Sequence, residues 1–301
     1  MSDDSERVSV HGRVFQRISL DEKIYFAPVA IDDREESRLT AQHRLVARIF
    51  GDSLFSSKVS VENPSAILEC GYGNGEWAVQ CAEDFEDCEV TAVDIFPMDL
   101  PDQPENLDLI CHNLNDPLRD PELFQANHYD LIHSRFVFPG IKTERWARYI
   151  RDMKLLLKPA GWVQMMEFLP IIQSHNGSLT EQSAVRRWWQ SYQGAMASMD
   201  RDPRIGRRLK QLLLDNRYRD VDVEVVQTRT LFPNSAEKAR IDPAQASLGG
   251  DSVAMIGDLL ESLGLWPFTS TLGRTAAEFD SLMEEVRTEL QDVSLKLYIE
   301  M

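Results

Sequence analysis

A glycine-rich segment that follows an apolar run constrains the fold of this chain more than any other feature. It covers residues 67–77, where Gly71, Gly73 and Gly75 stand at alternating positions ahead of a helical pattern. Glycine lets a backbone turn sharply and approach a ligand closely, and the start of a helix offers unpaired N–H groups to an anionic group. We therefore expect a strand, a tight loop and a helix that bind a small, partly anionic, nucleotide-like cofactor.

The spacing of the glycines distinguishes between two kinds of cofactor. A dinucleotide-binding loop reads G-x-G-x-x-G, and its third glycine permits close packing of helix on strand. Here that third position is Glu76, whose carboxylate is hard to reconcile with a bound pyrophosphate. The segment instead reads E-x-G-x-G-x-G, with Glu69 two residues before the first glycine. It resembles motif I of class I S-adenosylmethionine (SAM) methyltransferases, which implies S-adenosyl-L-methionine as the cofactor.

Short β-like runs alternate with helix-compatible segments along much of the chain. The expected strands are residues 66–70, 89–95, 107–111, 129–134, 162–168, 221–232 and 294–300. The expected helices include residues 35–50, 76–83 and 143–157 and a helical stretch over 178–218. Strands that alternate with helices indicate a parallel sheet with helices on both faces. We expect an α/β fold with a doubly wound, mostly parallel seven-stranded sheet of the Rossmann-like class I type.

The sequence also indicates how the chain is divided. Residues 1 to about 20 show no sustained period and are expected to form a loosely held arm. We assign residues 1–60 to an N-terminal arm and helical lid and residues 61–301 to the SAM-dependent domain, with a helical substrate cap inserted after the fifth strand at about 176–218.

Composition excludes several classes of partner. The chain has 301 residues, 43% of them hydrophobic, which is typical of a globular protein. Its net charge of −17 would repel a polyphosphate backbone, so we expect no nucleic-acid partner. The acidic N-terminus and the absence of a long uncharged apolar stretch predict no membrane association and a cytoplasmic or nuclear location. The four cysteines have no zinc-ligand spacing and are expected to be reduced.

Each handle of SAM needs a different partner. Asp94 ends the second expected strand, where a carboxylate can accept both ribose hydroxyls; the alternative is an ordinary strand-end or capping aspartate. Glu69 would contact the methionine ammonium through water or orient the loop, unless it only caps local N–H groups. Arg135 would pair with the methionine carboxylate, or form a surface salt bridge. The expected cofactor-binding residues are Tyr25, Glu69, Gly71, Tyr72, Gly73, Asn74, Gly75, Asp94, Ile95, Asn113, Leu114, His133, Ser134 and Arg135.

The residues after the third expected strand have two interpretations. Asn113, Leu114 and Asn115 could bring amides to the adenine edge. Equally, they could form only a turn of Asn and Asp before Pro117.

Taken with its surroundings, the glycine segment points to one family. The chain resembles the fungal LaeA-like methyltransferases, which are class I enzymes or regulators associated with secondary metabolism. The resemblance covers about residues 22–170, and it implies that a Tyr25-containing lead-in folds over the cofactor; otherwise Tyr25 is a plain packing aromatic. It rests on residues 25–28, 33–39, 42–43, 69–75, 94, 129–135 and 155–162. The chain departs from the family's loop pattern at Cys70, Tyr72, Asn74 and Glu76.

Methyl transfer from a sulfonium is an in-line displacement that needs positioning more than it needs a base. A hydroxyl or carboxylic acceptor could still lose its proton to a histidine. His133 is the first candidate, with Glu167 and His175 behind it, and the alternative for each is a structural role. No aspartate pair indicates a magnesium site, so we expect metal-independent transfer.

The helical stretch after the fifth strand is expected to cover the acceptor pocket. Trp188 and Trp189 project about 100° apart on a helix, so both cannot point in one direction. With Tyr192 and Met196 they would suit an apolar, flat small molecule, although such a stripe is more often core.

Three functions remain open at this stage. The first is a methyltransferase that acts on a small-molecule acceptor, O-directed rather than N-directed, in fungal secondary metabolism. The second is a LaeA-like regulatory SAM-binding protein that acts through protein partners. The third is a methyltransferase fold reused for a non-methylating reaction. Fold cannot separate them, and whether a protein partner or a homodimer is involved is also open.

Overall fold

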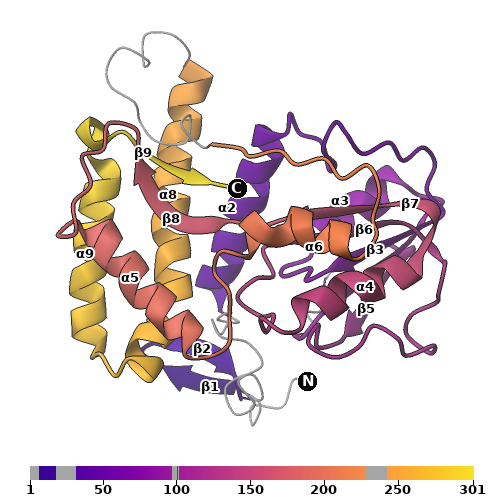
Figure 1. The fold of residues 1–301 in the computed structure, drawn as a ribbon, viewed down its shortest axis with the longest axis horizontal. Helices are drawn as coiled ribbons and strands as arrows, with labels where there is room; N and C mark the ends of the chain where they lie inside the picture. Colours follow the sequence, from indigo (N-terminus) through magenta and orange to yellow (C-terminus); the bar gives the residue numbers. More distant parts are fainter. Residues whose placement is uncertain (1–6, 18–31, 97–99, 101, 228–242) are drawn as a thin grey trace. The chain divides into compact units, whose positions relative to one another are not determined.

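The computed structural model describes residues 7–17, 32–96, 100, 102–227 and 243–301, with side chains in the last range described from residue 252. The chain forms two compact units (Figure 1). Unit 1 comprises Met1–Leu45, Phe168–Gly206 and Glu224–Met301, and unit 2 comprises Val46–Glu167 and Arg207–Val223.

Unit 2 contains a five-stranded, fully parallel sheet in the order β5-β4-β3-β6-β7. The central strand β3 is buried along its whole length, as expected for a parallel strand covered on both faces. Because the chain moves outward from β3 through β4 to β5 and then returns to the other side of β3, the carboxyl ends of β3 and β6 form a topological switch point, where α/β proteins bind ligands. The strands are β3 (Ala66–Cys70), β4 (Glu89–Asp94), β5 (Leu107–Cys111), β6 (Tyr129–Arg135) and β7 (Leu157–Met166).

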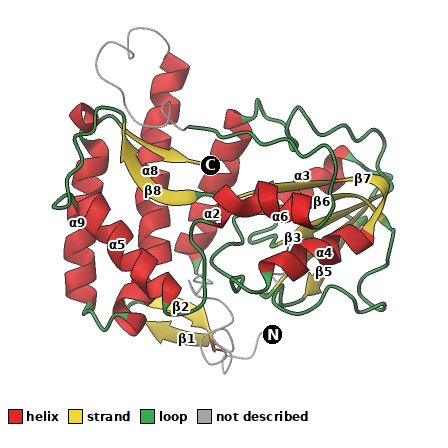
Figure 2. Ribbon diagram, viewed as in Figure 1, coloured by secondary structure: helices red, strands yellow, loops and turns green. Residues whose placement is uncertain are grey.

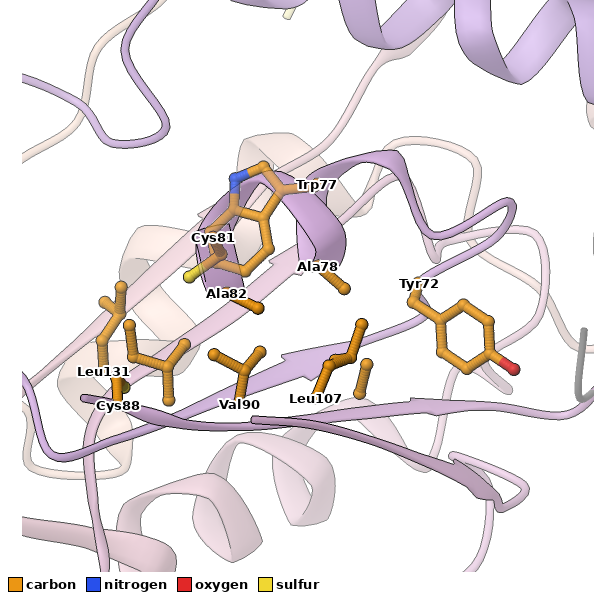
Figure 3. Close-up of a cluster of buried hydrophobic side chains, with 11 residues drawn as sticks. Tyr72, Trp77, Ala78, Cys81, Ala82, Cys88, Val90, Leu107 and Leu131 are labelled. Carbon is orange, nitrogen blue, oxygen red and sulfur yellow. The ribbon is translucent and has the colours of Figure 1, made fainter. Parts of the chain in front are cut away.

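Helix α3 (Glu76–Asp84) covers one face of this sheet. Its apolar side packs on side chains from the strands, as Figure 3 shows for Trp77, Ala78, Val90 and Leu131. Helix α4 (Trp146–Leu156) covers the opposite face. Its Tyr149 donates to Ser134 of β6, whereas Trp77 of α3 stacks on His133, and adjacent residues of a strand point to opposite faces. Helix α6 (Leu209–Asp215) contacts α4.

Unit 1 is mainly helical (Figure 2). Helices α5 and α9 contact each other, as do α8 and α9, and Trp188, Tyr192, Phe268 and Phe279 lie in their core. The elements are the hairpin β1 (Arg7–Val10) and β2 (Arg13–Gln16), the first part of α2 (Asp33–Ile49), β8 (Leu169–Ser174), α5 (Ala184–Ala197), η2 (Ile205–Arg208), α8 (Pro243–Trp266), η4 (Pro267–Thr271), α9 (Ala276–Gln291), η5 (Val293–Leu295) and β9 (Leu297–Glu300).

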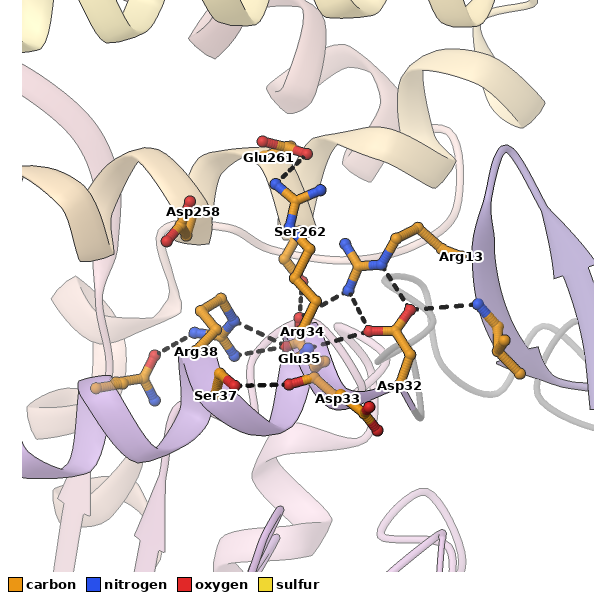
Figure 4. A network of polar contacts seen from close by, with 12 residues as sticks. Arg13, Asp32, Asp33, Arg34, Glu35, Ser37, Arg38, Asp258, Glu261 and Ser262 are labelled. Atoms are coloured by element: carbon orange, nitrogen blue, oxygen red, sulfur yellow. Dashed lines mark hydrogen bonds and ion pairs between the residues drawn. The ribbon is translucent and has the colours of Figure 1, made fainter.

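A buried ionic cluster joins the hairpin to α2 and α8 within unit 1 (Figure 4). The guanidinium of Arg13 donates to both oxygens of Asp32, and Glu35 accepts from Arg38 and from Ser262. Paired in this way, the buried charges avoid the desolvation cost of isolated ions.

The parallel α/β class predicted from the alternation is confirmed, and three finer predictions differ from the structure. Residues 7–16 form an antiparallel hairpin where a loose arm was expected. The described sheet of unit 2 has five strands rather than seven, and β8 and β9 form a separate antiparallel pair. Of the strand expected over 221–232, the described part contains only an isolated bridge, Gln227 to Glu300. The predicted functional division near residue 60 stays a prediction.

Candidate functional site

The glycine loop joins β3 to α3 at the switch point of unit 2. Gly71, Gly73 and Gly75 have φ values of 81°, 60° and 81°, a left-handed region that L side chains rarely adopt. A Cβ at Gly71 would lie 2.4 Å from Cγ1 of Val137, and one at Gly75 would lie 2.7 Å from Cδ1 of Leu100. Both conformation and space therefore require glycine here, as the spacing predicts.

Asp94, at the end of β4, is tied to this loop. Its Oδ2 accepts from the Gly73 N–H at 3.0 Å, and its Oδ1 accepts from the Phe96 N–H at 3.2 Å. Burial raises the pKa of the Asp94 carboxyl, and the N–H groups of Gly73, Phe96 and Ile95 oppose that rise. Each carboxylate oxygen has a second lone pair, so these contacts leave acceptor capacity for a diol.

Glu69 is the most unusual group of the loop's surroundings. It is fully buried in β3, and neither carboxylate oxygen has a hydrogen-bond partner among the described residues. Its Oε1 lies 3.7 Å from Nδ1 of His133, the residue opposite it on β6. Burial raises the pKa of Glu69 to about 8, while the charge of Arg135 lowers it and that of Asp94 raises it. Because such a carboxylate is costly without donors, it marks a place where a ligand can supply them.

His133 is enclosed on the α3 side of the sheet. Its ring stacks on Trp77 with centroids 4.0 Å apart and an interplanar angle of 16°. In register across the sheet, His133 is flanked by Glu69 and by Gln164, which accepts from the Ser56 N–H at 2.8 Å. Only 1% of the imidazole is exposed.

The two residues that follow His133 point to opposite faces. Ser134 accepts a hydrogen bond from the Tyr149 hydroxyl at 2.9 Å on the α4 side. Arg135 lies on the face of Glu69 and His133, since side chains alternate along a strand. Burial lowers the pKa of the Arg135 guanidinium, and the charges of Glu69 and Glu76 raise it. A half-buried cation and a buried carboxylate thus stand beside the glycine loop.

The asparagine segment after β5 is hydrogen-bonded both within itself and to residues 140 and 142. Asn115 donates to the Gly140 carbonyl at 2.8 Å and accepts from the Lys142 N–H at 2.9 Å. Asn113 Oδ1 accepts from the backbone N–H of Asn115 at 3.0 Å, the turn contact that was the alternative interpretation. Leu114 lies beside the loop, with Cδ1 4.0 Å from a Cβ built at Gly71.

The three candidate bases lie in different surroundings. Glu167, at the carboxyl side of β7, accepts from the N–H groups of Val137 and Phe138 in unit 2. His175 belongs to unit 1, where its ring stacks on Tyr298 at 4.0 Å between centroids. The structure thus groups His133 and Glu167 in one unit. Tyr25 lies outside the described residues.

The expected pocket residues of α5 are all buried. Trp188 stacks on Tyr192 with centroids 4.8 Å apart, and Trp189 and Met196 are 5% and 0% exposed. Phe268 stacks on Trp188 at 5.9 Å. This is the packing of a core within unit 1, and a role in acceptor binding stays a prediction.

Sequence reasoning missed Val137, Leu100 and Arg145. The first two approach the glycines through tertiary packing, which leaves no local signal in one sequence. Arg145 donates to the carbonyl oxygens of Leu114 and Asp116 and to Asp152. The signal for Arg145 is weak, because an arginine at a helix start resembles a solvated residue.

Comparison with known proteins agrees with this geometry. Residues 38–222 match the family described as a methyltransferase domain. The chain is 32% identical to Methyltransferase str3 of Strobilurus tenacellus over 60% of this chain and 62% of that protein. It is 27% identical to N-methyltransferase tcpN of Claviceps purpurea over 88% of this chain and 91% of that protein. It is 28% identical to the secondary metabolism regulator LAE1 of Hypocrea atroviridis over 55% of this chain and 47% of that protein.

A solved structure is also similar. It is phosphoethanolamine N-methyltransferase 2 of Haemonchus contortus in complex with S-adenosyl-L-methionine, with a TM-score of 0.45, 16% identity and coverage of 86% of this chain and 50% of that chain.

The family match covers more than half of the sequence, so the chain belongs to the methyltransferase-domain family. It is a class I SAM-dependent methyltransferase, and its resemblance to the fungal LaeA-like proteins is confirmed.

Two further properties concern the described residues alone. None of their helices has the length and apolar character needed to cross a membrane. They also contain no group of three or more His, Cys, Asp or Glu side chains arranged to hold a metal ion.

Proposed function

We propose that unit 2 binds SAM along its glycine loop and transfers the methyl group to a small-molecule acceptor. The observation that carries the proposal is the buried carboxylate of Glu69, whose oxygens accept no hydrogen bond from the described residues, beside a loop in which a Cβ at Gly71 would lie 2.4 Å from Val137. A cofactor with an ammonium group supplies the missing donors, and the glycines let it approach the backbone.

The other handles of SAM fit the remaining groups. Asp94 would accept the ribose hydroxyls, Arg135 would pair with the methionine carboxylate, and Asn113 with Leu114 would border the adenine. Opposite charges at Glu69 and Arg135 match the ammonium and carboxylate of the methionine tail.

The bound cofactor supplies a methyl group on a positively charged sulfur. The protein's contribution is to hold the acceptor in line with it and to exclude water, an effect worth up to about 7–11 kcal/mol in favourable cases. A base is needed only if the acceptor must lose a proton. His133 is our candidate, acting from the carboxyl end of β6.

The acceptor atom has two candidates. Oxygen is the acceptor expected from the sequence. Nitrogen is favoured by the similarity to N-methyltransferase tcpN, which spans 88% of this chain. A regulatory role is a second candidate function, supported by the 28% identity to the regulator LAE1.

Two further properties stay proposals: a protein partner or homodimer, and a cytoplasmic or nuclear location.

Calorimetric titration of SAM into the wild-type protein and into Asp94→Ala tests the binding site. We expect one SAM per chain in the wild type and at least about tenfold weaker binding in the variant, the effect of losing hydrogen bonds to a charged group. Equal affinity would remove Asp94 from the site.

Incubation with methyl-labelled SAM and a host metabolite extract tests the acceptor class. A labelled small molecule supports the proposed enzyme, and the labelled atom distinguishes oxygen from nitrogen. Absence of a labelled product, together with a co-purifying protein partner, would instead support the regulatory role.

A further inference from the structure

We propose that Glu167 is a positioning residue: its carboxylate fixes the turn of residues 136–138 against the glycine loop and thereby sets SAM affinity, rather than taking a proton from the acceptor. The inference rests on the SAM site proposed above.

The first observation is the pairing of this carboxylate with adjacent backbone groups. Oε1 of Glu167 accepts from the Val137 N–H at 3.1 Å, and Oε2 accepts from the Phe138 N–H at 3.3 Å. The residue is 5% exposed, so water does not compete with these donors. Two hydrogen bonds from adjacent N–H groups fix both the position and the orientation of the carboxyl group relative to the turn.

The second observation is that this turn needs support. Phe136 has a φ of 56°, a left-handed conformation that is unusual for a bulky residue. Such conformations persist only where the surrounding contacts fix them. The Phe136 N–H donates to the Met166 carbonyl at 2.9 Å, and Glu167 then holds the next two residues.

The third observation connects the turn to the cofactor loop. Cγ1 of Val137 occupies the space in front of Gly71, 2.4 Å from where a Cβ would be. The far end of the same segment is bonded to Asn115 through Gly140 and Lys142. A shift of the turn would therefore move the side chain that abuts the first glycine.

The surroundings of Glu167 also argue against a base. Both oxygens already receive a donor, so accepting a proton from the acceptor would weaken a backbone contact.

The test compares SAM affinity, by calorimetry, in the wild type, Glu167→Gln, Val137→Ala and the double variant. Glutamine keeps the size of the side chain but turns an NH₂ group toward one of the two N–H donors. We expect Glu167→Gln to bind SAM about tenfold more weakly, because one of the two hydrogen bonds that hold the turn is lost. Glu86→Gln, an exposed change of equal charge, should bind like the wild type.

The double variant separates positioning from a general loss of packing. If Glu167 acts through Val137, the two substitutions share one effect, and the double variant is weaker than Val137→Ala alone by much less than tenfold. Melting curves check that each variant is folded.

The outcomes are distinct. If the wild type binds SAM and Glu167→Gln binds it with equal affinity, the inference is overturned and the SAM site stands. That is the result expected if Glu167 acted only as a base. Fully additive effects overturn the route through Val137. No binding by the wild type overturns the SAM site and this inference with it. If Glu167→Gln does not fold, Val137→Ala alone decides: at least threefold weaker binding supports the inference, and unchanged binding overturns it.

Discussion

At the scale of single residues, Glu69 links the charge of the site to the stability of the fold. Its carboxylate is buried in the sheet beside His133, whose ring stacks on Trp77 of α3, and it has no hydrogen bond among the described groups. The protonated form is therefore favoured until a cation arrives. Its ordinary pKa of 4.5 rises to about 8 in the folded chain because burial disfavours the charge.

This pKa predicts a pH dependence of the unfolding free energy. Between its unfolded pKa of 4.5 and its folded pKa of about 8, Glu69 binds more protons in the folded state than in the unfolded state. Stability therefore falls as pH rises through that window. Urea unfolding at pH 5, 6.5 and 8 should show that the unfolding free energy of Glu69→Gln declines less steeply with pH than that of the wild type. The difference in slope corresponds to at most about one bound proton. The pKa values of Asp94 and Glu167 are also raised by burial, so the unfolding free energy of Glu69→Gln still falls somewhat as pH rises.

Glu86→Gln is the control, since this exposed residue should leave the wild-type slope unchanged. A slope in Glu69→Gln equal to that of the wild type would show that Glu69 does not hold a proton in the folded state.

At the scale of elements, the β3–loop–α3 unit depends on conformation and space together. Gly71→Ala places an alanine in the left-handed region and brings its Cβ against Val137. Gly51, in the same unit, has a φ of 70°, but a Cβ added there would meet no atom within 4 Å. The left-handed conformation costs about 1–2 kcal/mol for an L residue, and both variants should show it in their unfolding free energies. Gly71→Ala should lose more stability than Gly51→Ala, and it should also lose SAM affinity.

Adding Val137→Ala to Gly71→Ala isolates the steric part. We expect partial recovery of the unfolding free energy, because the strain in φ remains. Equal stability of Gly71→Ala and Gly51→Ala would contradict the close approach of Val137.

Elements differ in how far they could be predicted from the sequence. The strands of the parallel sheet were predicted from their apolar runs. The bounds of β3 and β5 agree with the prediction, those of β4 and β6 differ at one end, and β7 begins at Leu157 rather than at residue 162. The hairpin at residues 7–16 was missed because its strands are four residues long and carry arginines. The glycine loop was predicted from its spacing. The contacts of Val137 and Glu167 depend on how the glycine loop, the turn of residues 136–138 and the segment after β7 pack together. No periodic pattern in the sequence predicts that packing.

At the scale of the whole molecule, unit 1 contains an ionic cluster of its own. Arg13 binds Asp32 and Glu35, and Glu35 accepts from Ser262, all within unit 1. Arg13→Lys removes the two-pronged guanidinium contact, because an ammonium cannot reproduce its planar geometry.

Hydrogen exchange can detect this loss. We expect faster amide exchange in residues 7–16 of Arg13→Lys and unchanged exchange in β3 of unit 2. Arg7→Lys, an exposed change on the same hairpin, is the control. Exchange in the hairpin that matches the wild type would contradict a stabilising role for the cluster.

In the proposed site the Glu69 carboxylate meets the ammonium of SAM, and a calorimetric comparison of two ligands tests this contact. SAM and methylthioadenosine, which keeps the adenine and ribose but lacks the amino-acid tail, are titrated into the wild type and Glu69→Gln. We predict at least about tenfold weaker SAM binding in the variant, the effect of a lost contact between charged groups, with unchanged affinity for methylthioadenosine. Equal SAM affinity in the two proteins would contradict the claim, and so would equal losses for both ligands.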